Sequence, residues 1–161
     1  MKKLEILLNV YKYNDLQELN KDDKRLVENA IKAAHNAYAP YSHFHVGAAV
    51  LLENGQIITG NNQENAAYPS GLCAERVALF AANSQFPDIA VVAIAIVAIK
   101  DGKVLETAVA PCGSCRQVMI ETEVRFERPI RIILYGKKSI LVINSVKELM
   151  PLSFTASELN S

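Results

Sequence analysis

The longest apolar run in the chain limits most what it can fold into. Residues Ile89–Ile99 read IAVVAIAIVAI and contain no polar or charged side chain. β-branched residues dominate the run, and they favour a strand over a buried helix. A strand that is apolar on both faces has to be covered from both sides, as strands in α/β proteins are. The run therefore predicts a central strand with helices packed on each face of its sheet.

Helical and extended patterns alternate along the rest of the chain. Helices are predicted at Lys21–Tyr38, at Cys73–Asn83, from about Cys112, and from Ser145, where Ser145-Val-Lys-Glu148 is a capping-box pattern. Further strands are predicted at Val46–Leu52 and Gln56–Thr59, joined by a primed turn at Asn54-Gly55, and at Ile130–Tyr135 and Ile140–Ile143, with another turn at Asp101-Gly102. The alternation predicts an α/β fold, with three α/β/α layers around a mixed sheet of about five strands.

The first twenty residues lie outside this alternation. Met1–Leu8 faintly resembles a secretory signal, but Glu5 interrupts its apolar stretch and no cleavage site of small residues follows. We expect a short helix or flexible tail there, so that residues 1–20 form an N-terminal extension of unassigned role ahead of one domain at residues 21–161.

Charge and cysteine content limit the partners and the compartment. Lys and Arg number 17, as do Asp and Glu, so the formal net charge is zero. Nucleic acids are usually bound by a basic surface, so a small, nearly neutral ligand is the better expectation. No apolar run reaches the roughly 18–20 residues that cross a bilayer, so no membrane partner is expected. The three cysteines, an odd number, suit a reducing compartment and predict a cytoplasmic protein.

All three cysteines fall in two short motifs, Cys73-Ala-Glu-Arg76 and Pro111-Cys112-Gly-Ser-Cys115. Each motif is expected to open a helix, where Cys112 and Cys115 can converge on one metal ion. Cys73 would supply a third thiolate and leave the fourth tetrahedral position open. Structural zinc sites fill all four positions with protein ligands, whereas catalytic sites leave one for water. The alternatives are buried thiols or a simple C-x-x-C redox pair.

Two residues beside Cys73 favour the catalytic alternative. Glu75 places a carboxylate where metal-assisted hydrolysis needs a group to take and return a proton. Arg76 lies three residues after Cys73, on the same helix face, where its guanidinium can offset the charge of the thiolates. The alternative for Arg76 is an ordinary exposed helix arginine.

These motifs resemble the zinc deaminase pattern, H-x-E followed by P-C-x-x-C, in its three-cysteine variant. The likeness extends to Ala37–Ala49 (AYAPYSHFHVGAA) and Asn62–Tyr68 (NQENAAY), and together these segments are similar to the small cytidine deaminases of free nucleosides. The resemblance covers Lys21 to the C-terminus. It implies one catalytic domain at residues 21–161, Zn²⁺ as cofactor, hydrolysis of free cytidine and deoxycytidine in pyrimidine salvage, and a homotetramer with sites shared between subunits.

The resemblance also implies individual roles. It gives Cys73, Cys112 and Cys115 as zinc ligands, Glu75 as the proton shuttle, Asn62 and Glu64 as ribose contacts, Phe44 and Ala74 as further substrate contacts, and Phe154 as an aromatic residue lent to a neighbouring subunit. Without the resemblance, Phe44 reads as core, and Asn62 and Glu64 as turn and surface residues. The histidines His43 and His45 are expected on the surface or at an interface rather than as metal ligands.

The chain also departs from the family pattern. Asn61 and Gln63 flank the ribose motif with unusual side chains, and residues 101–109 lengthen the approach to Cys112, which suggests an extra hairpin. Three rival functions remain open at this point. They are a deaminase of cytosine-nucleoside antibiotics such as blasticidin, a polynucleotide or tRNA deaminase, and a non-catalytic zinc module. The first-ligand cysteine argues against the second rival, and Glu75 argues against the third.

Overall fold

The strand predicted from the apolar run is the centre of the sheet. The structure, a computed structural model, describes residues 1–159. Strand β4 (Val91–Lys100) lies between β2 (Phe44–Leu52), to which it is antiparallel, and β6 (Arg131–Gly136), to which it is parallel. Every side chain from Ala93 to Ile99 is buried. The prediction of a strand covered on both faces is therefore confirmed.

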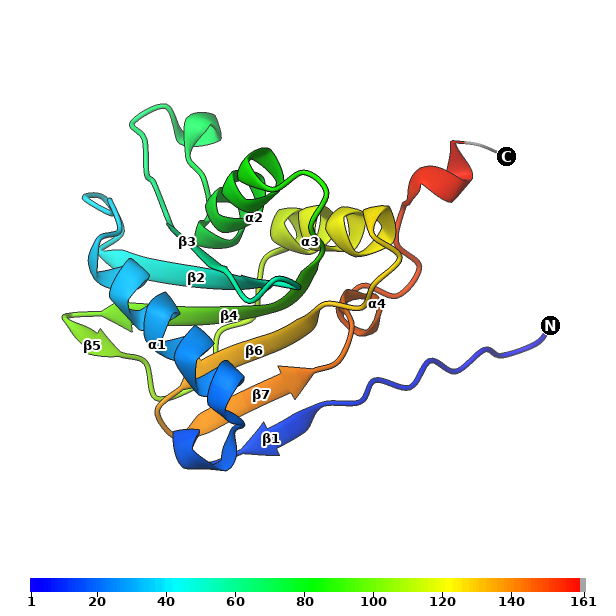
Figure 1. Cartoon of the computed structure of the whole chain (residues 1–161), viewed down its shortest axis with the longest axis horizontal. Coiled ribbons are helices and arrows are strands. Elements are labelled where there is room, and N and C mark those ends of the chain that lie inside the picture. Colours follow the sequence, from blue (N-terminus) through cyan, green and yellow to red (C-terminus); the bar gives the residue numbers. More distant parts are fainter. Residues whose placement is uncertain (160–161) are drawn as a thin grey trace.

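The sheet has seven strands in the described part of the chain, two more than the five predicted. Its order is β1-β7-β6-β4-β2-β3, with β5 beside the end of β4 (Figure 1). The outer strands are β3 (Ile57–Asn61) and β1 (Tyr11–Tyr13), which pairs with β7 (Ser139–Ile143). The two unpredicted strands are β1 and β5 (Lys103–Val104), and neither is long enough to show an alternating pattern. Strands β4 and β5 pair as a hairpin, which is the extra hairpin suggested for residues 101–109.

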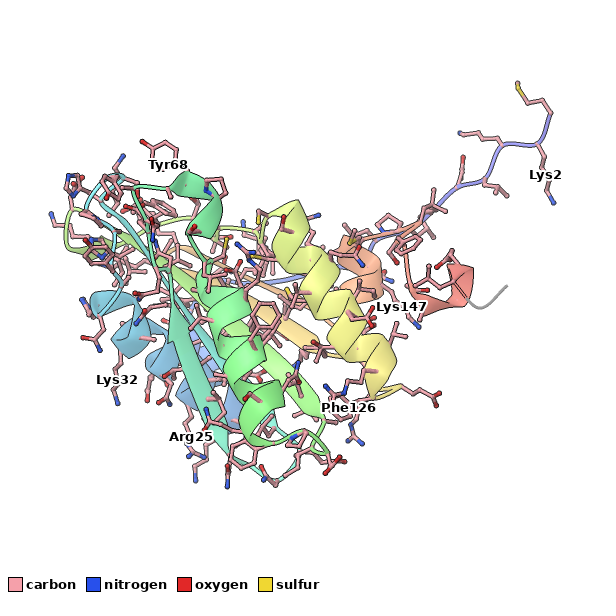
Figure 2. All side chains as sticks on the ribbon, turned by 90° about the horizontal axis from the view of Figure 1, so that it is seen from above. Lys2, Arg25, Lys32, Tyr68, Phe126 and Lys147 are labelled. Carbon is pink, nitrogen blue, oxygen red and sulfur yellow. The ribbon has the colours of Figure 1, made fainter. Side chains whose placement is uncertain are left out.

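Helices cover both faces of the sheet, so the predicted three-layer arrangement is confirmed. Helix α1 (Lys21–His35) packs on one face, and α2 (Ala74–Gln85) and α3 (Gly113–Arg125) pack on the other. Figure 2 shows α2, in green, and α3, in yellow, side by side on the same face of the sheet. Consecutive residues of a strand point to opposite faces of the sheet, and each face has its own hydrophobic core. Ala49, Ala95 and Val97 pack with α1, while Ala48, Val50, Ile94 and Ile96 pack with α2 and α3.

Two predicted boundaries differ from the structure. Helix α1 ends at His35 and not at Tyr38, because Tyr38 pairs with the chain that continues β3: its N–H donates to the carbonyl of Asn62 (3.0 Å), and its carbonyl accepts from Glu64 N–H (2.8 Å). The strands β2 and β3 are adjacent as predicted, but the prediction of a primed two-residue turn between them was wrong. Leu52 N–H donates to the carbonyl of Gln56 (2.9 Å), which makes a longer loop.

The N-terminal extension was predicted as a short helix or tail, and it contains no α-helix. Residues 1–10 have no regular secondary structure and continue outward from β1 with their apolar side chains exposed (Figure 1). After β1 and a 3₁₀ turn at Leu16–Glu18, the Asn20 side chain accepts from Asp23 N–H (2.9 Å) and caps α1. Residues 11–20 therefore extend the sheet and begin the first helix. In the part of the chain that the structure describes, no helix has the length and apolar character to cross a bilayer.

A buried carboxylate joins three elements near the C-terminus. Glu123 in α3 accepts hydrogen bonds from Ile130 N–H (2.9 Å) and Val146 N–H (2.8 Å). Its other oxygen accepts from the hydroxyl of Ser145 (2.6 Å). Ser145 caps the short helix α4 (Val146–Leu149) by accepting from Lys147 N–H, so its hydroxyl serves both Glu123 and the helix start. This carboxylate fastens α4 and the start of β6 to α3.

Helix α2 lies unusually close to β3 because Gly60 has no side chain. A Cβ atom at Gly60 would come within 2.4 Å of the backbone nitrogen of Ala78 and 2.7 Å of the carbonyl oxygen of Ala74. Glycine is the residue that permits such an approach of two backbones. The contact fixes the height of the N-terminal half of α2 above the sheet.

Candidate zinc and active site

The three cysteines meet where two helices begin. Cys73 is the N-cap of α2 and Cys112 the N-cap of α3, while Cys115 lies buried in the first turn of α3. Their three Sγ atoms lie within 4.8 Å of one another, and those of Cys112 and Cys115 are 3.5 Å apart. Thiolates at the usual zinc–sulfur distance of about 2.3 Å around a tetrahedral ion lie roughly 3.8 Å apart. The thiol set therefore fits one zinc ion, with a fourth position left for a non-protein ligand.

The surroundings of the cysteines favour the thiolate form at Cys73. The hydrogen bond with Cys115 lowers the pKa of Cys73 most, and the Arg76 guanidinium lowers it further. The same hydrogen bond, together with burial, raises the pKa of Cys115. Nη2 of Arg76 lies 3.8 Å from Sγ of Cys73 and 3.4 Å from the carbonyl oxygen of Gly71. The N-termini of two helices add partial positive charge at the same place.

Glu75 is a buried carboxyl group next to this cluster. It is the second residue of α2, and only 5% of it is exposed. Burial raises the pKa of Glu75, and the negative charge of Cys73 raises it further. A carboxyl group with a raised pKa is suited to exchange a proton during a reaction near neutral pH.

Glu75 lines a cleft of about 860 Å³ together with Cys73 and Cys112. Four further residues of this chain that were predicted to contact the substrate all line the same cleft: Phe44, Asn62, Glu64 and Ala74. Beyond the N-terminus of α2, the 3₁₀ helix η2 (Tyr68–Ser70) carries the exposed Tyr68 at the rim (Figure 2). A cleft of this volume is within the usual range for small-molecule sites.

Hydrogen bonds to the chain itself fix the two residues predicted to contact a sugar. The Glu64 carboxylate accepts from Tyr41 N–H (2.9 Å), from Ser42 N–H (3.3 Å) and from the Ser42 hydroxyl. The Ser42 hydroxyl and then the Tyr41 N–H lower the pKa of Glu64, so it is ionised at neutral pH. The Asn62 side chain accepts from Val46 N–H (2.7 Å) and donates to the carbonyl of Phe44 (2.9 Å). Strand β2 and the loop before it thus orient both polar groups.

Phe154 lies away from the cleft of its own chain. Phe154 is 57% exposed, and its backbone carbonyl accepts from the Nε2 amide of Gln117 in α3 (2.9 Å). The histidines His43 and His45 belong neither to the thiol cluster nor to the cleft lining. His43 precedes β2 and has a left-handed backbone (φ 54°), whereas His45 lies within β2, so the two histidines do not lie on one strand face.

Sequence reasoning missed two supporting residues. Nε of Arg116 donates to the carbonyl of Pro111 (2.9 Å), directly before Cys112, and its Nη1 donates to the carbonyl of Leu149 (2.8 Å). Ser42 links Glu64 to the start of β2. Ser42 stands inside the Ala37–Ala49 segment and Arg116 directly follows the motif that ends at Cys115, but no spacing rule separates them from ordinary surface side chains.

Comparison with known proteins defines the class. The family model for the cytidine and deoxycytidylate deaminase zinc-binding region matches residues 20–127. The chain belongs to this family of zinc-binding deaminases, which confirms the resemblance and the predicted zinc cofactor.

Individual relatives narrow the comparison to one branch of that family. A cytidine deaminase of Halalkalibacterium halodurans is 44% identical over 139 residues, which are 86% of this chain and 98% of the relative. Among solved structures, cytidine deaminase from Burkholderia pseudomallei matches with a TM-score of 0.67 at 38% identity, covering 81% of this chain and 97% of that one. Cytidine deaminase from Mycobacterium tuberculosis matches with a TM-score of 0.66 at 35% identity, covering 84% and 98%.

Proposed function

We propose that the chain hydrolyses the C4 amine of free cytidine and deoxycytidine, giving uridine or deoxyuridine and ammonia. The observation that carries the proposal is the buried Glu75 carboxyl group beside three converging thiols, in a cleft with room for a nucleoside. A metal site alone would serve a structural role equally well. The added buried acid gives the site a group that can move protons, which a structural zinc site does not need.

The residues of the chain divide the work of the reaction. Cys73, Cys112 and Cys115 would hold the zinc ion, which when bound would be the Lewis acid that activates water. Glu75 accepts a proton from the attacking water and delivers it to ring N3. Glu75 then passes the second proton of that water to the departing nitrogen, so oxygen replaces nitrogen at C4 and ammonia leaves. Arg76 offsets the charge of three thiolates, which would otherwise weaken the metal as a Lewis acid.

Four residues orient the nucleoside in this proposal. The Asn62 amide forms a hydrogen bond with one sugar hydroxyl, the ionised Glu64 accepts from another, and the Phe44 ring packs against the pyrimidine. Ala74 is the first residue of α2, and the N–H groups of a first helical turn have no partner inside the helix. Its backbone N–H can therefore donate to the pyrimidine carbonyl. Among residues 1–159, the cleft lining contains one cationic side chain, Arg76, which lies against Cys73, so the described lining favours a nucleoside over a nucleotide with its phosphate.

We also propose a cytoplasmic homotetramer whose sites are completed by Phe154 of a neighbouring subunit. The exposed Phe154 ring, outside its own cleft, supports this assembly, and three free thiols suit a reducing compartment. Sedimentation of the wild type is expected to give a tetramer. Phe154→Ala is expected to lower the activity, and a fully active monomer would refute the shared site.

The direct test follows the ultraviolet absorbance change when zinc-loaded protein is added to cytidine. We expect conversion to uridine with the wild type and none with Glu75→Ala at the same zinc stoichiometry. Zinc content measured on both proteins separates a lost proton shuttle from a lost metal. Stoichiometric zinc without conversion would remove cytidine as the substrate and would favour a modified cytosine nucleoside.

A further inference from the structure

We propose that Ser42 is a positioning residue that sets the orientation of the Glu64 carboxylate and ties it to the backbone of Phe44. The Ser42 hydroxyl donates to Oε1 of Glu64 and accepts from Phe44 N–H (3.0 Å). One hydroxyl group therefore connects the residue proposed for the sugar with the strand start that carries the residue proposed for the base. This inference rests on the proposed function, because it assigns Glu64 to the sugar.

The hydroxyl does something that the other donors to Glu64 cannot. The two backbone donors, Tyr41 N–H and Ser42 N–H, both reach Oε2. Among the described residues, the Ser42 hydroxyl is the donor that reaches Oε1. Without it, the carboxylate is held at one oxygen only and can rotate about that contact.

The occupied and free sites on Glu64 explain why its orientation matters. An ionised carboxylate offers about four lone-pair positions, of which the loop occupies three. The remaining position on Oε1 is available to a ligand hydroxyl in the cleft that Glu64 and Ser42 both line. Its direction is fixed only while the Ser42 hydroxyl holds the same oxygen.

The loop is built to keep the hydroxyl in place. His43 adopts a left-handed backbone (φ 54°), and its N–H donates to the carbonyl of Ala39 (3.1 Å). This tight bend brings Ser42 back toward Glu64 before β2 begins at Phe44. Glu64 is anchored to the same loop by its own N–H, which donates to the carbonyl of Tyr38 (2.8 Å). Backbone and side-chain contacts therefore agree on one arrangement.

The expected consequence is a selective loss. If Ser42 acts through Glu64, removing its hydroxyl weakens only those substrates that offer a sugar hydroxyl to Glu64. We compare cytidine with 2′,3′-dideoxycytidine, which lacks both candidate hydroxyls. Ser42→Ala is expected to lower kcat/KM for cytidine roughly tenfold, mostly by raising KM. A tenfold loss corresponds to the lower end of what a hydrogen bond to a charged group contributes. The dideoxy substrate is expected to change by less than about twofold, because the pairing of Phe44 with Lys100 in β4 still holds the residue that packs on the pyrimidine.

Two matched variants complete the experiment. Ser42→Thr keeps the hydroxyl and is expected to retain the wild-type ratio of the two kcat/KM values. Ser84→Ala removes an exposed serine in the last turn of α2, outside the cleft, and is expected to leave both substrates unchanged. In a Glu64→Ala background, Ser42→Ala is expected to have little further effect on the ratio, since the pair then no longer exists.

The outcomes separate failure of this inference from failure of the proposed function. An equal loss on both substrates, or no loss on either, overturns the role of Ser42. If Glu64→Ala lowers the preference for cytidine and Ser42→Ala leaves it at the wild-type value, Ser42 has no positioning role while the deaminase activity stands. If Glu64→Ala leaves the preference intact, the sugar contact is wrong and the inference fails with it. A wild type that converts neither nucleoside refutes the proposed function itself.

Discussion

Gly60→Ala tests how closely α2 must lie on the sheet for the site to form. The added Cβ would lie 2.4 Å from the Ala78 nitrogen, about 1 Å short of the 3.4 Å at which ordinary van der Waals contact begins. Both contacted atoms belong to the backbone of α2, so the whole first half of the helix has to move outward. Overpacking of this kind costs about 1–3 kcal/mol, and we expect the upper end because no side chain can turn aside.

The displaced half of α2 carries Cys73 and Glu75, so activity should fall more than stability. A misplacement of about 1 Å at reacting groups costs on the order of 100-fold in rate. Urea unfolding of the zinc-loaded protein measures the first effect, and kcat/KM for cytidine measures the second. Gly113→Ala is the matched control, because it stands beside Cys112 and a Cβ there meets nothing within 4 Å. A Gly60→Ala protein with wild-type midpoint and activity would show that the close approach is not required.

Four further results are expected. Glu123→Gln should lower the free energy of unfolding by about 2–3 kcal/mol in urea titrations, since an amide N–H₂ replaces one of the two carboxylate oxygens that together accept from three donors; an unchanged midpoint would contradict this. Chelation of zinc should make Cys73 and Cys112 reactive toward a thiol reagent while the buried Cys115 reacts slowly, and the loaded protein should resist the reagent; equal reactivity with and without the chelator would contradict this. The Ser42 hydroxyl lowers the pKa of Glu64, so this bond stabilises the fold fully above the carboxyl's ordinary value of 4.5 and is lost as the pH falls below it. The urea-midpoint difference between wild type and Ser42→Ala should therefore stay constant from pH 7 down to 4.5 and shrink below, and a difference that does not shrink below pH 4.5 would refute the linkage. Deleting residues 1–13 should expose the edge of β7 that β1 covers, and the exposed edge should cause aggregation, seen as increased light scattering on storage. A deletion variant as soluble as the wild type would show that β1 does not protect the chain from aggregation.

The parts of the fold that could be predicted are those in which one segment carries its own signal. Strand β4 was recognised because both of its faces are apolar over many residues. Strand β1 was missed because its extended form depends on pairing with β7, in the register Tyr11 with Val142, and not on its own three residues. A strand that is specified by its partner leaves no local periodicity.

Turn chemistry shows the same limit in two similar dipeptides. Asp101 (φ 51°) and Gly102 (φ 71°) form the primed two-residue turn between β4 and β5. Asn54-Gly55 was expected to do the same, but in this pair only Gly55 has a positive φ (83°). The register of β2 against β3, with Leu51 opposite Ile57, leaves room for a longer loop. Strand register decided the turn length, and the dipeptide alone could not.

The candidate site divides in the same way. The thiols and Glu75 could be found because metal chemistry requires fixed residue types at fixed spacing. Ser42 and Arg116 act on residues 22 and 33 positions away, and Arg116 reaches only backbone atoms there. Phe154 was proposed from resemblance alone, and its place in an assembly remains a prediction. Supporting contacts of this kind depend on the folded arrangement and on no local pattern.

The origin of the three thiols has a consequence for the lifetime of the folded protein. Cys73 follows the β2–β3 hairpin, whereas Cys112 follows β4 and β5, so an ion shared between them joins chain segments from two parts of the sheet. The shared ion closes a loop of about 40 residues between Cys73 and Cys112. A covalent cross-link over such a loop would lower the conformational entropy of the unfolded chain and so raise its free energy by about 4 kcal/mol. Helices α2 and α3 cannot separate while the ion stays bound to both. The slow step in irreversible inactivation should then be the escape of zinc, so the half-life on heating is set by metal dissociation and shortens with chelator concentration.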